Sequence, residues 1–230
     1  MANNRVFYAC QSVNLANTLL KGVQSVGVNS TFNFEQVFQL GQVELYENIE
    51  GVPEVEFTIE RALDGNTSMY TLLGGNATTP GQSILDVGNA STIGILSIYP
   101  DDKQSDYTPV SQAVKATGLF VSNWSCNINL DGPSTESMSL VGNHQDWTVT
   151  DNAGNTTGSE ANVIKRQSLD SSSTLPYTTS RLQSISVSVD FGREDLQELG
   201  SKYPYFKAPT FPTEVTSEFA YLAKNDSIVI

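Results

Sequence analysis

Histidine, cysteine and basic residues are scarce in this sequence of 230 residues. His144 is the single histidine and lies in a polar stretch, so a histidine-rich metal site is excluded and any catalytic triad would depend on that one residue. The two cysteines, Cys10 and Cys126, lack the spacing of a metal site or redox motif. We expect two free thiols, and the sequence leaves open whether they form a disulfide.

Positive charge is also scarce. Lysine and arginine number 12 against 25 aspartate and glutamate residues, which gives a net charge of −13. Proteins that read nucleic acids need basic patches that release counterions, so we do not expect tight DNA binding. An acidic surface that DNA merely passes agrees with this composition, because like charges prevent adhesion.

Long apolar segments are missing. The N-terminal residues contain no apolar signal core, and no stretch reaches the roughly 20 apolar residues that span a bilayer. We therefore expect a protein that is made and assembled in a cytoplasm, with no membrane insertion.

Motifs that carry chemistry do not occur either, whether phosphate-binding loops, nucleophile elbows or zinc-protease motifs. The closely spaced carboxylates Glu54, Glu56 and Glu60 are more typical of a solvated strand face than of an acid–base pair. We predict that the chain is not an enzyme, with no catalytic residue, no cofactor and no metal.

Alternation of polar and apolar residues dominates what is present. Val55, Phe57 and Ile59 alternate with acidic residues, which predicts a strand with one buried face. We expect this strand, residues 54–60, to form a hairpin with residues 42–47. A second hairpin is predicted for residues 119–130 and 134–141. Further strands are expected at residues 5–13, 23–34, 93–99, 182–191 and 214–222.

Helical signals are short, and we expect helices over residues 67–73, 109–117 and 193–200. Residues 142–173 are rich in Gly, Asn, Ser and Thr, which predicts a long exposed loop or arm around one short strand at residues 147–150. The whole chain, residues 1–230, is predicted to be a single mainly β domain. Its fold is an antiparallel β-sandwich or barrel with two or three short helices and long loops.

Two segments resemble bacteriophage tail tube proteins. The first is the Phe-rich stretch 27–50 with the following VPEVEFTIE at residues 52–60 and LDG at residues 63–65. The second is DLQELGSKYPYFK at residues 195–207, followed by FPTEVT at residues 211–216. These regions cover about a third of the chain, and residues 75–180 match no part of the family pattern.

The resemblance implies a subunit that forms hexameric rings whose sheets join into an inner β-barrel. The rings stack into a hollow tube that carries viral DNA and contacts other tail proteins such as sheath, tail terminator and baseplate. Acidic residues expected to face the lumen are Glu44, Glu54, Glu56 and Glu60. Residues expected at contacts between subunits are Phe32, Phe34, Phe38, Asp151, Asn155, Tyr203, Tyr205, Phe206 and Phe211.

Two other classes of protein remain open at this stage. One is a different structural part of a virion, such as a tail terminator or completion protein, a baseplate hub or a capsid decoration protein. The other is a host-binding or carbohydrate-binding β-sandwich, which would gather aromatic residues in a groove. The tryptophans and tyrosines are scattered along this sequence, which argues against that class.

Overall fold

The computed structural model describes residues 11–41, 43–74, 82–99, 112–148, 162–168 and 181–222. The strands are β1 (Gln11–Leu15), β2 (Thr18–Leu19), β3 (Val23–Thr31), β4 (Phe34–Phe38), β5 (Leu45–Glu50), β6 (Glu54–Ala62), β7 (Ser91–Ile98), β8 (Gln112–Asn129), β9 (Thr135–Gly142), β10 (His144–Thr148), β11 (Arg181–Asp190), β12 (Arg193–Leu196), β13 (Phe206–Pro209) and β14 (Glu214–Leu222). The helices are α1 (Met69–Leu72), α2 (Gln82–Asn89) and the short 3₁₀ helix η3 (Arg166–Ser168). The predicted mainly β, antiparallel class is confirmed.

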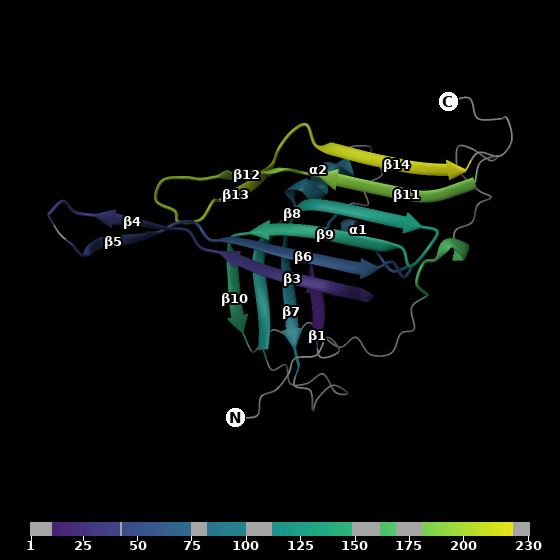
Figure 1. Cartoon of the computed structure of the whole chain (residues 1–230), viewed down its shortest axis with the longest axis horizontal. Helices are drawn as coiled ribbons and strands as arrows, with labels where there is room; N and C mark the ends of the chain where they lie inside the picture. Colours follow the sequence, from purple (N-terminus) through teal and green to yellow (C-terminus); the bar gives the residue numbers. More distant parts are fainter. Residues whose placement is uncertain are drawn as a thin grey trace.

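Strand β8, with 18 residues, organises the main sheet of ten strands. Its N-terminal half lies between β7 and β10, and its C-terminal half lies between β9 and β11. One layer therefore has the order β2-β1-β7-β8-β10, and the other has the order β14-β11-β8-β9-β6-β3. In Figure 1, β1, β7 and β10 cross β3, β6 and β9 at a steep angle. The described strands thus form a sandwich-like fold and no closed barrel.

Glycines allow β8 to pass from one layer to the other. Gly118 has φ +64°, a left-handed conformation that side chains disfavour. Opposite it, a Cβ atom on Gly142 would lie 2.9 Å from Leu119 Cδ2 and 3.1 Å from the Gly118 carbonyl oxygen. The long hairpin of β8 with β9 and β10 can therefore bend here without losing its antiparallel pairing.

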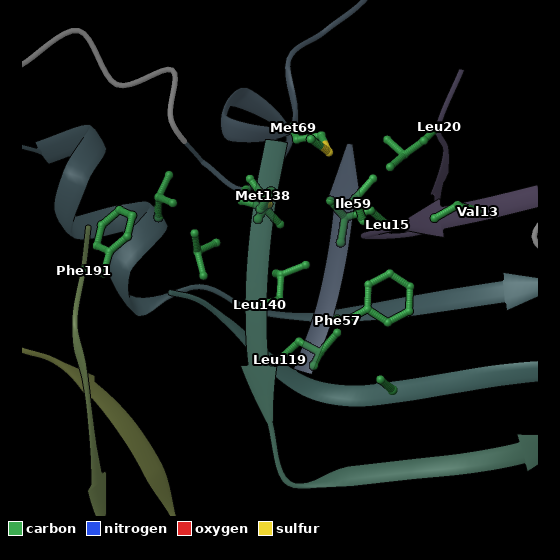
Figure 2. Close-up of a cluster of buried hydrophobic side chains, with 14 of the residues drawn as sticks. Val13, Leu15, Leu20, Phe57, Ile59, Met69, Leu119, Met138, Leu140 and Phe191 are labelled. Carbon is green, nitrogen blue, oxygen red and sulfur yellow. The ribbon is translucent and has the colours of Figure 1, made fainter. Parts of the chain in front are cut away.

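The hydrophobic core lies between the two layers (Figure 2). Leu15 from the first layer meets Phe57, Leu119 and Leu140 from the second, and all four side chains are fully buried. Short helix α1 contributes the buried Met69. Because β6 and β9 alternate between buried residues and residues that are partly or fully exposed, only one face of the second layer is used by this core.

A buried ion pair links the second layer to α1. Arg61 and Glu136 are directly opposite on β6 and β9, and Arg61 Nε lies 2.8 Å from Glu136 Oε2, with side chains 2% and 0% exposed. Arg61 also donates to the Thr67 carbonyl at 2.6 Å. Glu136 Oε1 accepts from the Met69 amide at 2.9 Å and from Trp124 Nε1 at 2.8 Å. Each charge therefore has several partners, as a buried pair requires.

The predicted hairpin of residues 42–47 with 54–60 is wrong. The strand Leu45–Glu50 pairs with β4, whereas β6 lies between β3 and β9. The apolar face of β6 is covered by the core, and β5 is exposed along its whole length, so β5 cannot supply the buried neighbours that β6 needs. The alternation identified β6 correctly but not its partner.

Two predicted helices are also wrong. Residues 112–117 are part of β8, because Ala113, Val114 and Ala116 are buried between β7 and β10. Residues 193–196 form β12, which pairs with β13. The helix predicted at 67–73 is confirmed as α1, and α2 was not predicted.

Several boundaries differ from the predictions. The first described strand is β1, because residues 5–10 lie outside the described part, and the strand expected at 147–150 is observed as His144–Thr148. The strands expected at 119–130, 134–141, 182–191 and 214–222 are confirmed. Cys126 is a free, half-buried thiol whose pKa is raised by burial and by the nearby Glu136 carboxylate; Cys10 lies outside the described residues.

We expect Glu136→Leu to lower the free energy of unfolding by about 3–5 kcal/mol, because it leaves the Arg61 guanidinium buried without its counter-ion. Urea denaturation followed by tryptophan fluorescence measures this loss. Glu60→Gln replaces the exposed acid next to Arg61 on β6; it is the matched control and should change stability by less than about 0.5 kcal/mol. Equal stability of the two variants would contradict a structural role for the ion pair.

Candidate functional site: a polar sheet face and a projecting arm

The face of the second layer that points away from the core is polar on every strand. We call it the polar face, and the strand registers define it. Its polar members are Ser25, Asn29 and Thr31 on β3, Glu54, Glu56, Thr58 and Glu60 on β6, Thr135, Ser137 and Ser139 on β9, Asn123, Ser125, Asn127 and Asn129 on β8, Ser184, Ser186, Ser188 and Asp190 on β11, and Glu214, Thr216 and Glu218 on β14. Six strands spaced by about 4.8 Å make this face about 24 Å wide.

The polar members named above are carboxylates and neutral groups, with no lysine or arginine among them. Its acids lie towards its two sides, on β6 and along β11 and β14, and hydroxyl and amide side chains occupy the strands between. Neighbouring groups pair with each other: the Ser125 and Ser137 hydroxyls are 2.7 Å apart, and Ser25 donates to Glu60 at 3.2 Å. The face is therefore hydrated and negative, without a binding centre for phosphate.

The two strands that border the polar face have open edges. Among the described strands, β3 pairs only with β6, and β14 pairs only with β11. Each edge presents backbone N–H and C=O groups that a further strand can complete. On the reverse side of β14, the apolar side chains of Val215 and Phe219 are each about half exposed.

Strands β4 and β5 form a projecting hairpin, residues 34–50, that we call the arm. They pair with each other and with no other described strand (Figure 1). Phe34 and Phe38 are largely exposed, and Leu40 and Val43 near the tip are fully exposed. An apolar surface of this kind on a single chain is typical of a contact with another molecule.

An ion pair and a backbone hydrogen bond lie at the base of the arm. Lys202 Nζ lies 2.6 Å from the exposed Glu50 carboxylate, and this contact lowers the pKa of Glu50 and raises that of Lys202. The Gly51 amide donates to the Asn33 carbonyl at 2.7 Å and closes the arm. Tyr203 lines a hollow of about 300 Å³ beside Phe32 and Phe34 and a second hollow of about 260 Å³ beside Tyr205 and Phe206.

Arg193 fixes the segment that supports this base. Its guanidinium donates to the carbonyls of Val121 at 2.7 Å, Gly88 at 2.7 Å and Lys207 at 3.0 Å, and it lies over the ring of Phe120 at 5.5 Å. Burial lowers its pKa to about 10, so it stays charged at neutral pH. Strands β12 and β13 are thereby attached to both β8 and α2.

The structure brings together three of the four acids expected in a lumen. Glu54, Glu56 and Glu60 share one exposed face of β6. Glu44 lies instead in the turn of the arm, whose two strands form a separate sheet. Sequence reasoning missed Asp190, Glu214 and Glu218 as members of the same face. Their signal was the alternation of residues 182–191 and 214–222, but the pairing of these strands with β8 was needed to align them.

The residues expected at subunit contacts fall into three groups. Phe32, Phe34, Phe38, Tyr203, Tyr205 and Phe211 are exposed. Phe206 is partly buried within its own chain, where its ring meets the edge of Phe120 at 5.4 Å. Asp151 and Asn155 lie outside the described residues.

The described residues contain no cluster of three or more histidine, cysteine, aspartate or glutamate side chains that could hold a metal ion. Within the same part of the chain, no helix is long and apolar enough to cross a membrane. His144 is exposed, with its Nε2 atom 2.8 Å from Asp146. Within the described residues, the polar face and the arm are therefore the candidate functional surfaces.

No protein-family model matches the sequence, and no curated protein matches it. Among solved structures, the anti-feeding prophage cap, a tube-terminating cap, matches with a TM-score of 0.50 and 10% identity over 65% of this chain and 95% of that chain. A sheath–tube complex of the PVC extracellular contractile injection system matches with a TM-score of 0.48 and 8% identity over 65% and 95%. Hcp1 from Flavobacterium johnsoniae matches with a TM-score of 0.36 and 14% identity over 60% and 99%. The first of these likenesses shows that the chain shares its fold with a tube-terminating cap.

Proposed function

We propose that this chain is the repeating subunit of a bacteriophage tail tube, in which hexameric rings stack and viral DNA passes through the lumen. The observation that supports the proposal is the polar face, which spans a whole sheet layer, has acidic and neutral polar members, and is bordered by two strand edges that are open among the described strands. Such a surface suits the wall of a channel better than it suits a binding site.

Lateral assembly follows from the two edges. The β14 edge of one copy can pair with the β3 edge of the next copy by strand addition, which extends the sheet from subunit to subunit. The polar faces then lie side by side and form one continuous wall. The exposed Val215 and Phe219 on the reverse of β14 are covered by the same neighbour.

The charge of this wall suits the passage of DNA. Carboxylates on β6 and β14 repel phosphate over the roughly 8–10 Å that screening allows in cellular salt. The Ser, Asn and Thr side chains between them keep the wall hydrated and offer no cation to which DNA would adhere. The subunit is thus assigned to the virion tail, assembled in the host cytoplasm and joined at its ends to other tail proteins.

A second candidate function is a cap that ends a tube. The fold likeness to the anti-feeding prophage cap favours it. Both functions use the open edges to make a ring. They differ along the axis of the tube, since a tube subunit contacts a ring on each side, whereas a cap contacts a ring on one side. The arm and the opposite end of the sheet therefore decide between them.

Electron microscopy of the concentrated, purified protein should show hollow tubes of uniform width, because two complementary surfaces along the axis repeat without closing. Discrete rings without tubes would instead support the second candidate function, a cap. Protein that stays monomeric at every concentration and salt condition would contradict both functions.

The location of the polar face can be measured in assembled tubes. In a Cys10→Ser/Cys126→Ser background, Glu56→Cys should react with a small maleimide but not with a bulky polyethylene glycol maleimide, because the lumen admits only the small reagent. Asp86→Cys is the matched control, since it replaces an exposed acid on α2, on the core side of the sheet. It should react with both reagents. Equal labelling of the two positions by the bulky reagent would place the polar face outside the lumen.

A further inference from the structure

The tip of the arm combines apolar and negative groups. Phe38, Leu40 and Val43 are exposed there, and Glu44 and Glu47 lie beside them. Residues 32–50 contain no lysine or arginine. A partner surface for the tip therefore needs an apolar floor and positive charge.

A surface with these properties lies in the same subunit, at the opposite end of the main sheet from the arm. A groove of about 520 Å³, which we call the basic groove, is lined by Leu130, Asp131, Gly132, Pro133, Val163, Lys165, Arg166 and Gln167. The side chains of Lys165 and Arg166 are exposed, and neither forms an ion pair with another described residue. With one acid, Asp131, against two bases, the described residues that line the groove carry a net positive charge.

Backbone hydrogen bonds fix the basic groove to the end of the sheet. The Ile164 amide donates to the Leu63 carbonyl at 2.7 Å, and the Ser134 amide donates to the Ile164 carbonyl at 3.1 Å. Leu63 in turn donates to Ser134 at 2.8 Å. The segment with Lys165 and Arg166 is thus joined to the C-terminal end of β6 and the N-terminal end of β9.

The arm leaves from the opposite end of β6. Thr31 pairs with Glu54 at the first residue of β6, and the arm lies between these two strands in sequence. The nine residues Glu54–Ala62 separate the two ends by about 27 Å. Figure 1 shows β4 and β5 projecting beyond one end of the sheet, while the turn between β8 and β9 and the green segment at residues 162–168 lie at the other end.

We propose that the arm of one copy docks in the basic groove of the next copy along the tube. Glu44 and Glu47 face Lys165 and Arg166, and the apolar tip residues cover Leu130 and Val163. The contact joins two different surfaces, so it passes from copy to copy without closing. This inference rests on the proposed tube, and it names the surface that receives the arm.

A charge exchange tests the docking. Lys165→Glu/Arg166→Glu and, separately, Glu44→Lys/Glu47→Lys should each raise the critical concentration for tube formation about tenfold or more, because like charges then meet across the contact. The variant with all four substitutions has the same net charge as the wild-type chain. It should form tubes again, since the two signs are merely exchanged. Sedimentation and electron microscopy measure the polymer, and thermal unfolding verifies that each variant is folded.

The outcomes separate the docking from the tube itself. Unchanged polymerisation of Lys165→Glu/Arg166→Glu, or a folded four-fold variant that does not polymerise, overturns the docking while the tube stands. Wild-type protein that never polymerises overturns the tube and the docking together. Loss in both charge-reversed pairs with recovery in their combination supports the docking, because a general effect of charge would not be restored by exchange.

Discussion

The buried pair of Arg61 and Glu136 is the interaction on which the rest of the structure depends. It connects β6 with β9, and through Trp124 and the amide of Met69 it also holds β8 and α1. Charges removed from water stay stable only with a full set of partners, so these elements have one relative arrangement. The ion pair thus holds the second layer from its core side, and the polar residues of the opposite face remain at the surface of the chain.

The surfaces that this arrangement leaves free point in two different directions. The open edges of β3 and β14 extend the sheet across its strands, whereas the arm and the basic groove lie beyond the strand ends. In the proposed tube, contacts within a ring and contacts between rings therefore use separate residues. Each set can change strength without altering the other, because the sheet between them is rigidly hydrogen-bonded.

Local pattern was sufficient for some elements and insufficient for others. Strand β6 and its acidic face follow from alternation with a period of two, a property that the chain carries without knowledge of its neighbours. The partner of β5 does not follow, because pairing depends on which edges are free after the core has formed. Strand β12 resembles a short helix in sequence, yet Arg193 reaches carbonyls at Gly88 and Val121 that are distant along the chain. The basic groove is equally non-local, since Ile164 is placed by Leu63 and Ser134.

The isolation of the arm has a kinetic consequence. A ribbon of two strands is only marginally stable by itself in water, and β4 and β5 have no third strand in their own chain among the described residues. In the proposed tube, the first contact between two copies therefore carries the entropic cost of ordering this hairpin. Once an arm is docked, it is already ordered, and the next copy that binds meets a smaller entropic cost. In the proposed tube, growth from an existing end is consequently faster than the start of a new polymer.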